Sequence, residues 1–84
     1  MNQIVFTYDG KKHTGYIISS TNLQPHYHWF YFNDEELIKQ VDDCIGFKLQ
    51  NNELTPTRHF KNHDHLVETV KQIVQQRISS SNQN

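Results

Sequence analysis

A chain of 84 residues, with 8 Lys and Arg against 9 Asp and Glu, has room for a single domain and carries a net charge of −1. A domain of this length buries only about 60% of the surface that its unfolded chain exposes, which leaves little volume for an enclosed catalytic cavity. These numbers favour a binding surface over a self-contained enzyme. They also argue against nucleic acid as a partner, because phosphate binding normally needs a basic excess.

The cysteine content and the hydropathy of the chain predict a cytoplasmic protein. Cys44 is the only cysteine, so no intramolecular disulfide can form, whereas small secreted domains usually need several. The first residues have neither the basic nor the apolar region of a signal peptide. No apolar run approaches the length of a membrane span, so we expect no contact with a membrane.

The N-terminal residues predict a β-hairpin. Residues 4–8 are β-branched and aromatic, Asp9-Gly10 is a strong turn signal, and residues 16–18 supply the return strand. Two registers fit this pattern. A two-residue turn places His13 on the same face as the phenylalanine of the first strand, and a turn one residue longer places Thr14 there.

A loop, an aromatic strand and a short helix are expected next. Residues 19–25 are polar and end in proline, which predicts a loop, and His26–Phe32 follows as a strand. Asn33 can cap a helix whose first turn is acidic, which suits the positive end of the helix dipole. We expect this helix to stop near Gln40, since the two aspartates that follow would be unfavourable at a helix C-terminus.

A second hairpin follows the short helix. Residues 45–50 alternate between apolar and polar side chains, which is the pattern of a half-buried strand. Asn51-Asn52 can turn with positive φ. Leu54 and Thr55 then predict a short return strand that Pro56 closes, as expected at the edge of a sheet.

The last element is an amphipathic helix with an apolar stripe between residues 66 and 78. Asn62 or Asp64 is its expected cap. The whole order predicts an α+β fold with a mostly antiparallel sheet of about five strands and the long C-terminal helix packed on one face. The single domain is expected to cover residues 1–78, with residues 79–84 as a disordered polar tail.

The aromatic strand is the main functional candidate. Five of the ten aromatic residues lie in its seven positions, and side chains alternate across a strand. One face carries His26, His28, Phe30 and Phe32, and the other carries Tyr27, Trp29 and Tyr31. Phe30 and Phe32 lack polar groups, so we expect them to meet the C-terminal helix.

Two interpretations of the Tyr27, Trp29 and Tyr31 row are open. In the first, the row is ordinary packing in a small core. In the second, it is partly exposed because one helix cannot cover both faces of the sheet, and it then binds a protein partner or a second copy of the chain. Stacking on single-stranded nucleic acid is a further alternative, which the balanced charge weakens.

Six histidines raise a metal-binding alternative. His26 and His28 share one face of the strand, and His59, His63 and His65 cluster before and into the last helix, so a histidine-ligated site or a small metal-dependent enzyme is conceivable. The spacing is not specific, however, and no carboxylate accompanies it at a recognisable interval. We therefore assign no metal, cofactor or catalytic residue, and the predicted binding residues are His26, Tyr27, His28, Trp29 and Tyr31.

The remaining reactive side chains do not predict an enzyme. Cys44 follows Asp42 and Asp43, whose charge disfavours a thiolate, so a small buried side chain is expected there rather than a nucleophile. The three glycines form no phosphate-binding loop, and no Ser-His-Asp arrangement is present. The function expected from the sequence is a non-enzymatic binding or protein-interaction module, and no motif identifies a family.

Overall fold

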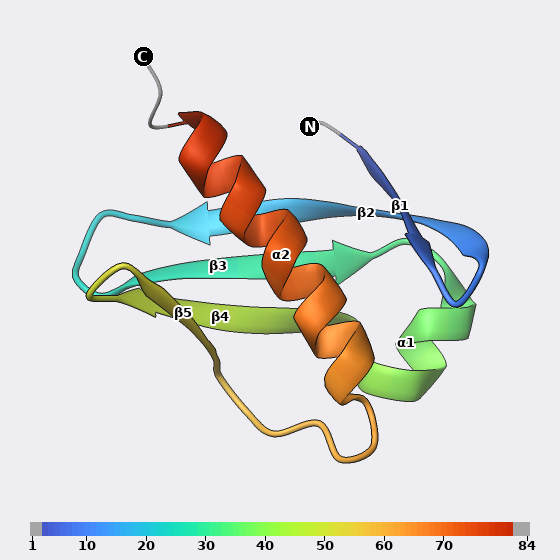
Figure 1. Cartoon of the computed structure of the whole chain (residues 1–84). Helices are drawn as coiled ribbons and strands as arrows, with labels where there is room; N and C mark the ends of the chain where they lie inside the picture. The colour runs from blue at the N-terminus through green and yellow to red at the C-terminus, as the bar shows by residue number, and fades with distance from the viewer. Residues whose placement is uncertain (1–2, 82–84) are drawn as a thin grey trace.

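The computed structural model describes residues 3–81, which form a curled antiparallel sheet with two helices (Figure 1). The predicted α+β fold is therefore confirmed. The order of the five strands in the sheet is their order in the chain. The strands are β1 (Ile4–Tyr8), β2 (Lys11–Ser20), β3 (His26–Phe32), β4 (Cys44–Gln50) and β5 (Glu53–Pro56), and the helices are α1 (Glu35–Val41) and α2 (Asp64–Ser81).

The first hairpin has the two-residue turn. Phe6 pairs with His13, and Tyr8 pairs with Lys11. Asp9 and Gly10 between them have φ values of 55° and 75°. Positive φ at both central residues belongs to the turn whose twist matches that of the flanking strands. The alternative with a longer turn is therefore wrong, and His13 lies on the face of the sheet that carries Phe6.

The second hairpin forms as the sequence predicts. Asn51 and Asn52 have φ values of 56° and 64°, and Leu49 pairs with Leu54. β5 is an edge strand that ends at Pro56, whose missing N–H is tolerated at an edge.

The start of α1 differs from the prediction. Asp34, not Asn33, is the N-cap residue, and the helix ends at Val41. Asn33 instead extends the pairing of β3 with β2, because its N–H donates to the Thr14 carbonyl at 3.0 Å and its side-chain amide donates to the Thr14 hydroxyl at 3.4 Å. The prediction of Asn33 as cap was wrong because its hydrogen-bonding groups are engaged by the neighbouring strand.

α2 crosses the sheet diagonally on one side (Figure 1). Its first intrahelical bond runs from the Val67 N–H to the His63 carbonyl at 3.0 Å. His63 therefore occupies the N-cap position of α2, between Asn62 and Asp64, which were the two residues predicted for it. Asp64 is the first helical residue. The helix continues past Ile78 to Ser81, and the rest of the predicted tail, residues 82–84, lies outside the described residues.

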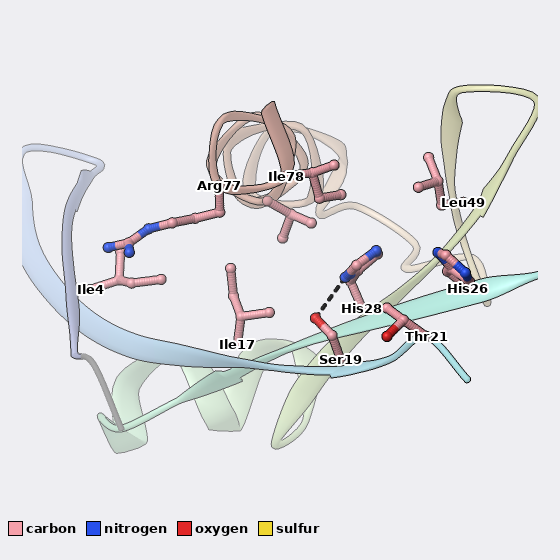
Figure 2. A pocket seen from close by; sticks show the side chains of 10 residues that line it. Ile4, Ile17, Ser19, Thr21, His26, His28, Leu49, Arg77 and Ile78 are labelled. Atoms are coloured by element: carbon pink, nitrogen blue, oxygen red, sulfur yellow. Dashed lines mark hydrogen bonds between the residues drawn. The ribbon is translucent and has the colours of Figure 1, made fainter. Parts of the chain in front are cut away.

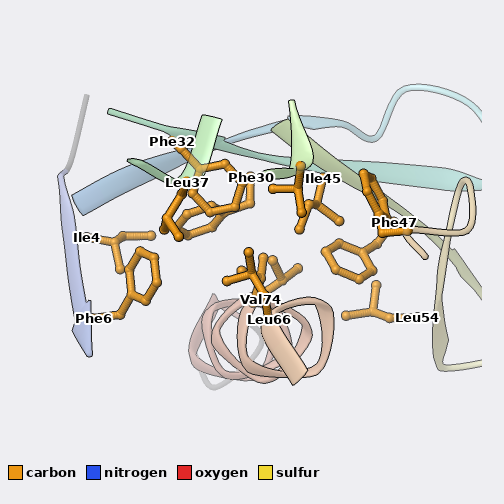
Figure 3. Packing of buried hydrophobic residues seen from close by; sticks show 13 residues of the cluster. Ile4, Phe6, Phe30, Phe32, Leu37, Ile45, Phe47, Leu54, Leu66 and Val74 are labelled. Atoms are coloured by element: carbon orange, nitrogen blue, oxygen red, sulfur yellow. The ribbon is translucent and has the colours of Figure 1, made fainter. Parts of the chain in front are cut away.

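The hydrophobic core lies between the sheet and α2 (Figure 3). Phe30 and Phe32 of β3 are buried there, as predicted, and the Phe30 ring packs edge-on against Phe6 with centroids 5.5 Å apart. α1 buries Leu37 in the same cluster. Between residues 3 and 81, no helix is both long and apolar enough to cross a membrane.

Candidate functional site

The sheet face opposite α2 carries the Tyr27, Trp29 and Tyr31 row of β3. The register sets Tyr16 of β2 beside Tyr31 and Ile18 beside Trp29. We call the side chains of Tyr16, Ile18, Tyr27, Trp29 and Tyr31 the open face. Among the described residues, both helices direct their buried side chains to the opposite side, into the core with Phe30 and Phe32.

The rings of the open face are ordered against one another. Tyr16 and Tyr31 stack with centroids 5.3 Å apart and planes 9° apart, and Tyr27 and Trp29 stack at 5.9 Å and 16°. All four rings are half-buried, and Ile18 is 43% exposed. The row predicted as a binding surface thus consists, with Tyr16, of two stacked and partly exposed ring pairs.

Gly46 of β4 makes room for the central ring of this surface. It pairs with Trp29, and a Cβ at this position would overlap the Cζ3 and Cε3 atoms of the indole. The sequence analysis missed this contact. The available signal was a glycine in the middle of a strand, which often marks a close approach of another group to the backbone.

Cys44 and Tyr31 form a pair at one end of the open face. Burial raises the pKa of the Cys44 thiol, and the charges of Asp42 and Asp43 add to this effect, while a hydrogen bond from Tyr31 opposes it in part. The neighbouring Cys44 is also the main cause that raises the pKa of Tyr31, followed by burial. Both groups are therefore uncharged at neutral pH, and Cys44 is not an activated nucleophile.

His26 and His28 line a different site, on the α2 side of the sheet. A cleft of about 610 Å³ opens there between α2 and the strands (Figure 2). We call it the histidine cleft, and its polar lining consists of Ser19, Thr21, His26, His28 and Arg77. The five predicted binding residues therefore belong to two surfaces on opposite faces of the sheet.

His28 is the most deeply placed polar group of the histidine cleft. His28 is only 6% exposed. Its Nδ1 shares a hydrogen bond of 2.7 Å with the Ser19 hydroxyl. Its Nε2 is buried and has no hydrogen-bond partner among the described residues. Burial lowers the pKa of His28, and the neighbouring His26 lowers it further, so the neutral imidazole is favoured.

The later histidines do not join His26 and His28. His65 packs against Tyr8 near the start of α2, with ring centroids 5.4 Å apart, whereas the histidine cleft involves Val74 and Ile78 in the second half of that helix. Within residues 3–81, no group of three or more His, Cys, Asp or Glu side chains is placed to hold a metal ion. The geometry thus offers no support for the metal alternative.

The sequence analysis also missed a hydrogen bond between a buried histidine and a carboxylate. His13 is only 4% exposed, and its Nδ1 donates to the Asp34 carboxylate at 2.5 Å while its Nε2 faces the Tyr8 carbonyl at 3.3 Å. The pair joins β2 to the start of α1, so its role is structural. The two-residue hairpin register was the signal, because it turns His13 toward the core.

Comparison with known proteins finds no matching family model, no matching curated protein and no matching solved structure.

Proposed function

We propose that this protein is a non-enzymatic interaction module that binds a second copy of its own chain through the open face. The observation that carries the proposal is the presence of two stacked ring pairs beside Ile18, on the face opposite the buried side chains of both helices. Trp29 is at the centre of the β3 row, between Ile18 and Gly46 on the flanking strands.

The chemistry of these side chains suits a protein partner. Tyr and Trp are enriched at the centres of protein interfaces because each has a large apolar body and a polar group at its edge. Rings that are already stacked lose little conformational freedom on binding, which reduces the entropic cost of association. Trp29 is therefore the expected main contributor to the binding energy.

The charge of the open face favours a copy of the same chain. A twofold interface brings one surface against itself, so a strongly charged surface would repel its own copy. Lys12 and Lys48 lie toward the two ends of this sheet face, Glu53 lies near Lys48 on β5, and the aromatic centre carries no charge at neutral pH. A neutral centre with charges of both signs at its rim is self-complementary.

The size of the sheet is compatible with a weak dimer. Five strands spaced about 4.8 Å apart and about seven residues long span a face of roughly 500 Å². Two such faces bury about 1,000 Å², at the lower limit for specific interfaces. We therefore expect a dissociation constant in the micromolar range, on the order of 1 to 100 µM.

Sedimentation velocity over a range of protein concentrations tests the proposal. The wild type should pass from monomer to dimer as its concentration rises, and Ile18→Glu should remain monomeric because it buries a charge in the interface. Leu23→Glu is the matched control, since it makes the same change at a residue that is 80% exposed on the loop after β2. This variant should dimerise like the wild type.

Trp29 provides a second measurement, because it is the only tryptophan. Acrylamide should quench its fluorescence less as the protein dimerises. A wild-type protein that stays monomeric at all concentrations, with Trp29 equally accessible to quencher throughout, would overturn the proposal. Salt-sensitive binding of a single-stranded oligonucleotide, abolished by Trp29→Ala, would instead assign the open face to nucleic acid.

A further inference from the structure

The histidine cleft contains a buried nitrogen that the fold itself leaves unpaired. His28 is 6% exposed, Ser19 engages its Nδ1 at 2.7 Å, and its Nε2 has no partner among the described residues. Figure 2 shows the other ring nitrogen turned away from Ser19, toward the α2 side of the cleft. Native proteins rarely leave a buried polar atom unpaired, so this nitrogen calls for a partner from outside the chain, either a water molecule or a ligand.

The contact with Ser19 is compatible with two tautomers of His28, because the Ser19 hydroxyl can donate to Nδ1 or accept from it. Burial and the neighbouring His26 favour the neutral imidazole, which carries a proton on only one nitrogen. When the Ser19 hydroxyl donates to Nδ1, the ring proton lies on Nε2. His28 then presents an N–H donor to the cleft, and an acceptor on the ligand completes the bond.

The rest of the lining suits an acceptor with an apolar body and does not repel a negative charge. Beside His28, the lining includes His26 and the hydroxyl side chains of Ser19 and Thr21, and it includes no Asp or Glu. The other half of the lining is aliphatic, and Figure 2 shows Ile17 and Ile78 on opposite sides of the cleft. A phosphate would leave most of its oxygens unpaired against these aliphatic walls, whereas a carboxylate needs fewer donors.

We propose that the histidine cleft binds a small amphipathic monocarboxylate, whose carboxylate accepts a hydrogen bond from His28 Nε2 and whose apolar body packs against Ile17 and Ile78. The volume of about 610 Å³ is in the range of small-molecule sites. The cleft lies on the opposite side of the sheet from the open face, so this site does not depend on self-association.

Titration with octanoate, followed by protein NMR, tests this site. Octanoate should shift the amide signals of β3 and the C-terminal half of α2, and it should shift the His28 side-chain nitrogen signals. Octanol and octylamine have the same apolar body, but octanol lacks the charge and octylamine reverses it, so both should bind more weakly. Equal binding of octanol and octanoate would overturn the proposal, because it would show apolar partition without recognition of the carboxylate.

Two variants and one control examine the role of His28. His28→Leu should weaken octanoate binding about tenfold or more, since tenfold corresponds to the loss of one good hydrogen bond. Ser19→Ala should weaken octanoate binding less than His28→Leu does. Without the hydroxyl the ring proton can lie on either nitrogen, so Nε2 remains a donor in part of the molecules. His59→Leu makes the same change at an exposed histidine outside the cleft and should bind octanoate like the wild type.

The result for the wild type remains decisive if His28→Leu does not fold. Absence of any octanoate-induced change in the His28 nitrogen signals would overturn the proposal, as would unchanged affinity in a folded His28→Leu. Ile18→Glu should bind octanoate normally, because it alters only the open face. Failure of octanoate binding and failure of dimerisation can therefore be distinguished.

Discussion

The Gly46→Ala substitution should force Trp29 out of its place on the open face. The added methyl group would overlap Cζ3 and Cε3 of the indole, and Thr57 Oγ1 is only 3.1 Å from the methyl position. Since the methyl group is attached to the backbone of β4 between its pairings with β3 and β5, it cannot move aside. The indole must therefore rotate away from the sheet, or the two strands must separate.

Three contributions determine the expected loss of stability. Forcing a methyl group into a filled space costs about 1–3 kcal/mol. Loss of the Tyr27–Trp29 stack costs a further ~0.5–1.5 kcal/mol. Replacing a glycine within a strand returns about 0.5–1 kcal/mol, because the unfolded chain loses conformational freedom. We expect a net loss of about 0.5–4 kcal/mol in the free energy of unfolding.

Urea unfolding followed by circular dichroism measures this loss, and the fluorescence of Trp29 reports the position of the ring. The emission should shift to longer wavelength in Gly46→Ala. Gly10→Ala is the matched control: it has no atom within 4 Å of the added methyl group but a φ of 75°. It should cost about 1–2 kcal/mol through backbone strain and leave the emission of Trp29 unchanged.

A double-mutant cycle provides the strictest test. In a Trp29→Ala background the overlap is absent, so Gly46→Ala should become stabilising by about 0.5–1 kcal/mol. Equal destabilisation by Gly46→Ala with and without the indole would refute the steric explanation.

Four further predictions concern the buried and titratable groups. Burial lowers the pKa of His28 below 6.5 in the folded protein, so on acidification His28 is protonated in the unfolded chain before it is protonated in the folded one. The free energy of unfolding should therefore fall as pH falls from 6.5 toward the folded-state pKa. His28→Gln should show a smaller decline in urea unfolding over the same pH range, and an equal decline would contradict the assignment. Asp34→Ala should cost about 1–3 kcal/mol in thermal unfolding because it removes the partner of His13 Nδ1, whereas the exposed Glu35→Ala should change stability by less than about 0.5 kcal/mol. Leu66→Ala, at a fully buried position under the sheet, should cost about 2–5 kcal/mol, and half-buried Val67→Ala should cost clearly less in the same urea assay. Since burial raises the pKa of the Cys44 thiol, iodoacetamide should alkylate it more slowly than free cysteine near pH ~8, and a faster reaction would show an activated thiol.

The elements of this fold were predictable because their signals are local. Asp9-Gly10 and Asn51-Asn52 turn the chain with positive φ, as their side chains allow, and His26–Phe32 is a strand with the limits expected from its sequence. The apolar stripe from Leu66 to Ile78 specified the long helix. The alternation of side chains in β3 was enough to predict which face would bury Phe30 and Phe32.

The residue at the N-cap of α1 and the register of the first hairpin were decided only by the tertiary structure. Asn33 and Asp34 can both cap a helix, but Thr14 and His13 of β2 engage their side chains. Asp34 therefore occupies the N-cap position without a side-chain cap hydrogen bond. Both hairpin registers were compatible with the local pattern, and the two-residue turn is the one that brings His13 to Asp34. Such contacts join residues about twenty positions apart, which local patterns do not specify.

The division of the aromatic strand into two candidate sites likewise required the tertiary structure. The alternation in β3 separated Tyr27, Trp29 and Tyr31 from His26 and His28, but it did not reveal what surrounds each group. Stacking with Tyr16 of β2 orders Tyr31 in the first group, and in the cleft beside α2 the Nε2 atom of His28 is buried with no partner within residues 3–81. The sequence determined the faces of the strand, and packing against distant elements decided the chemistry of each face.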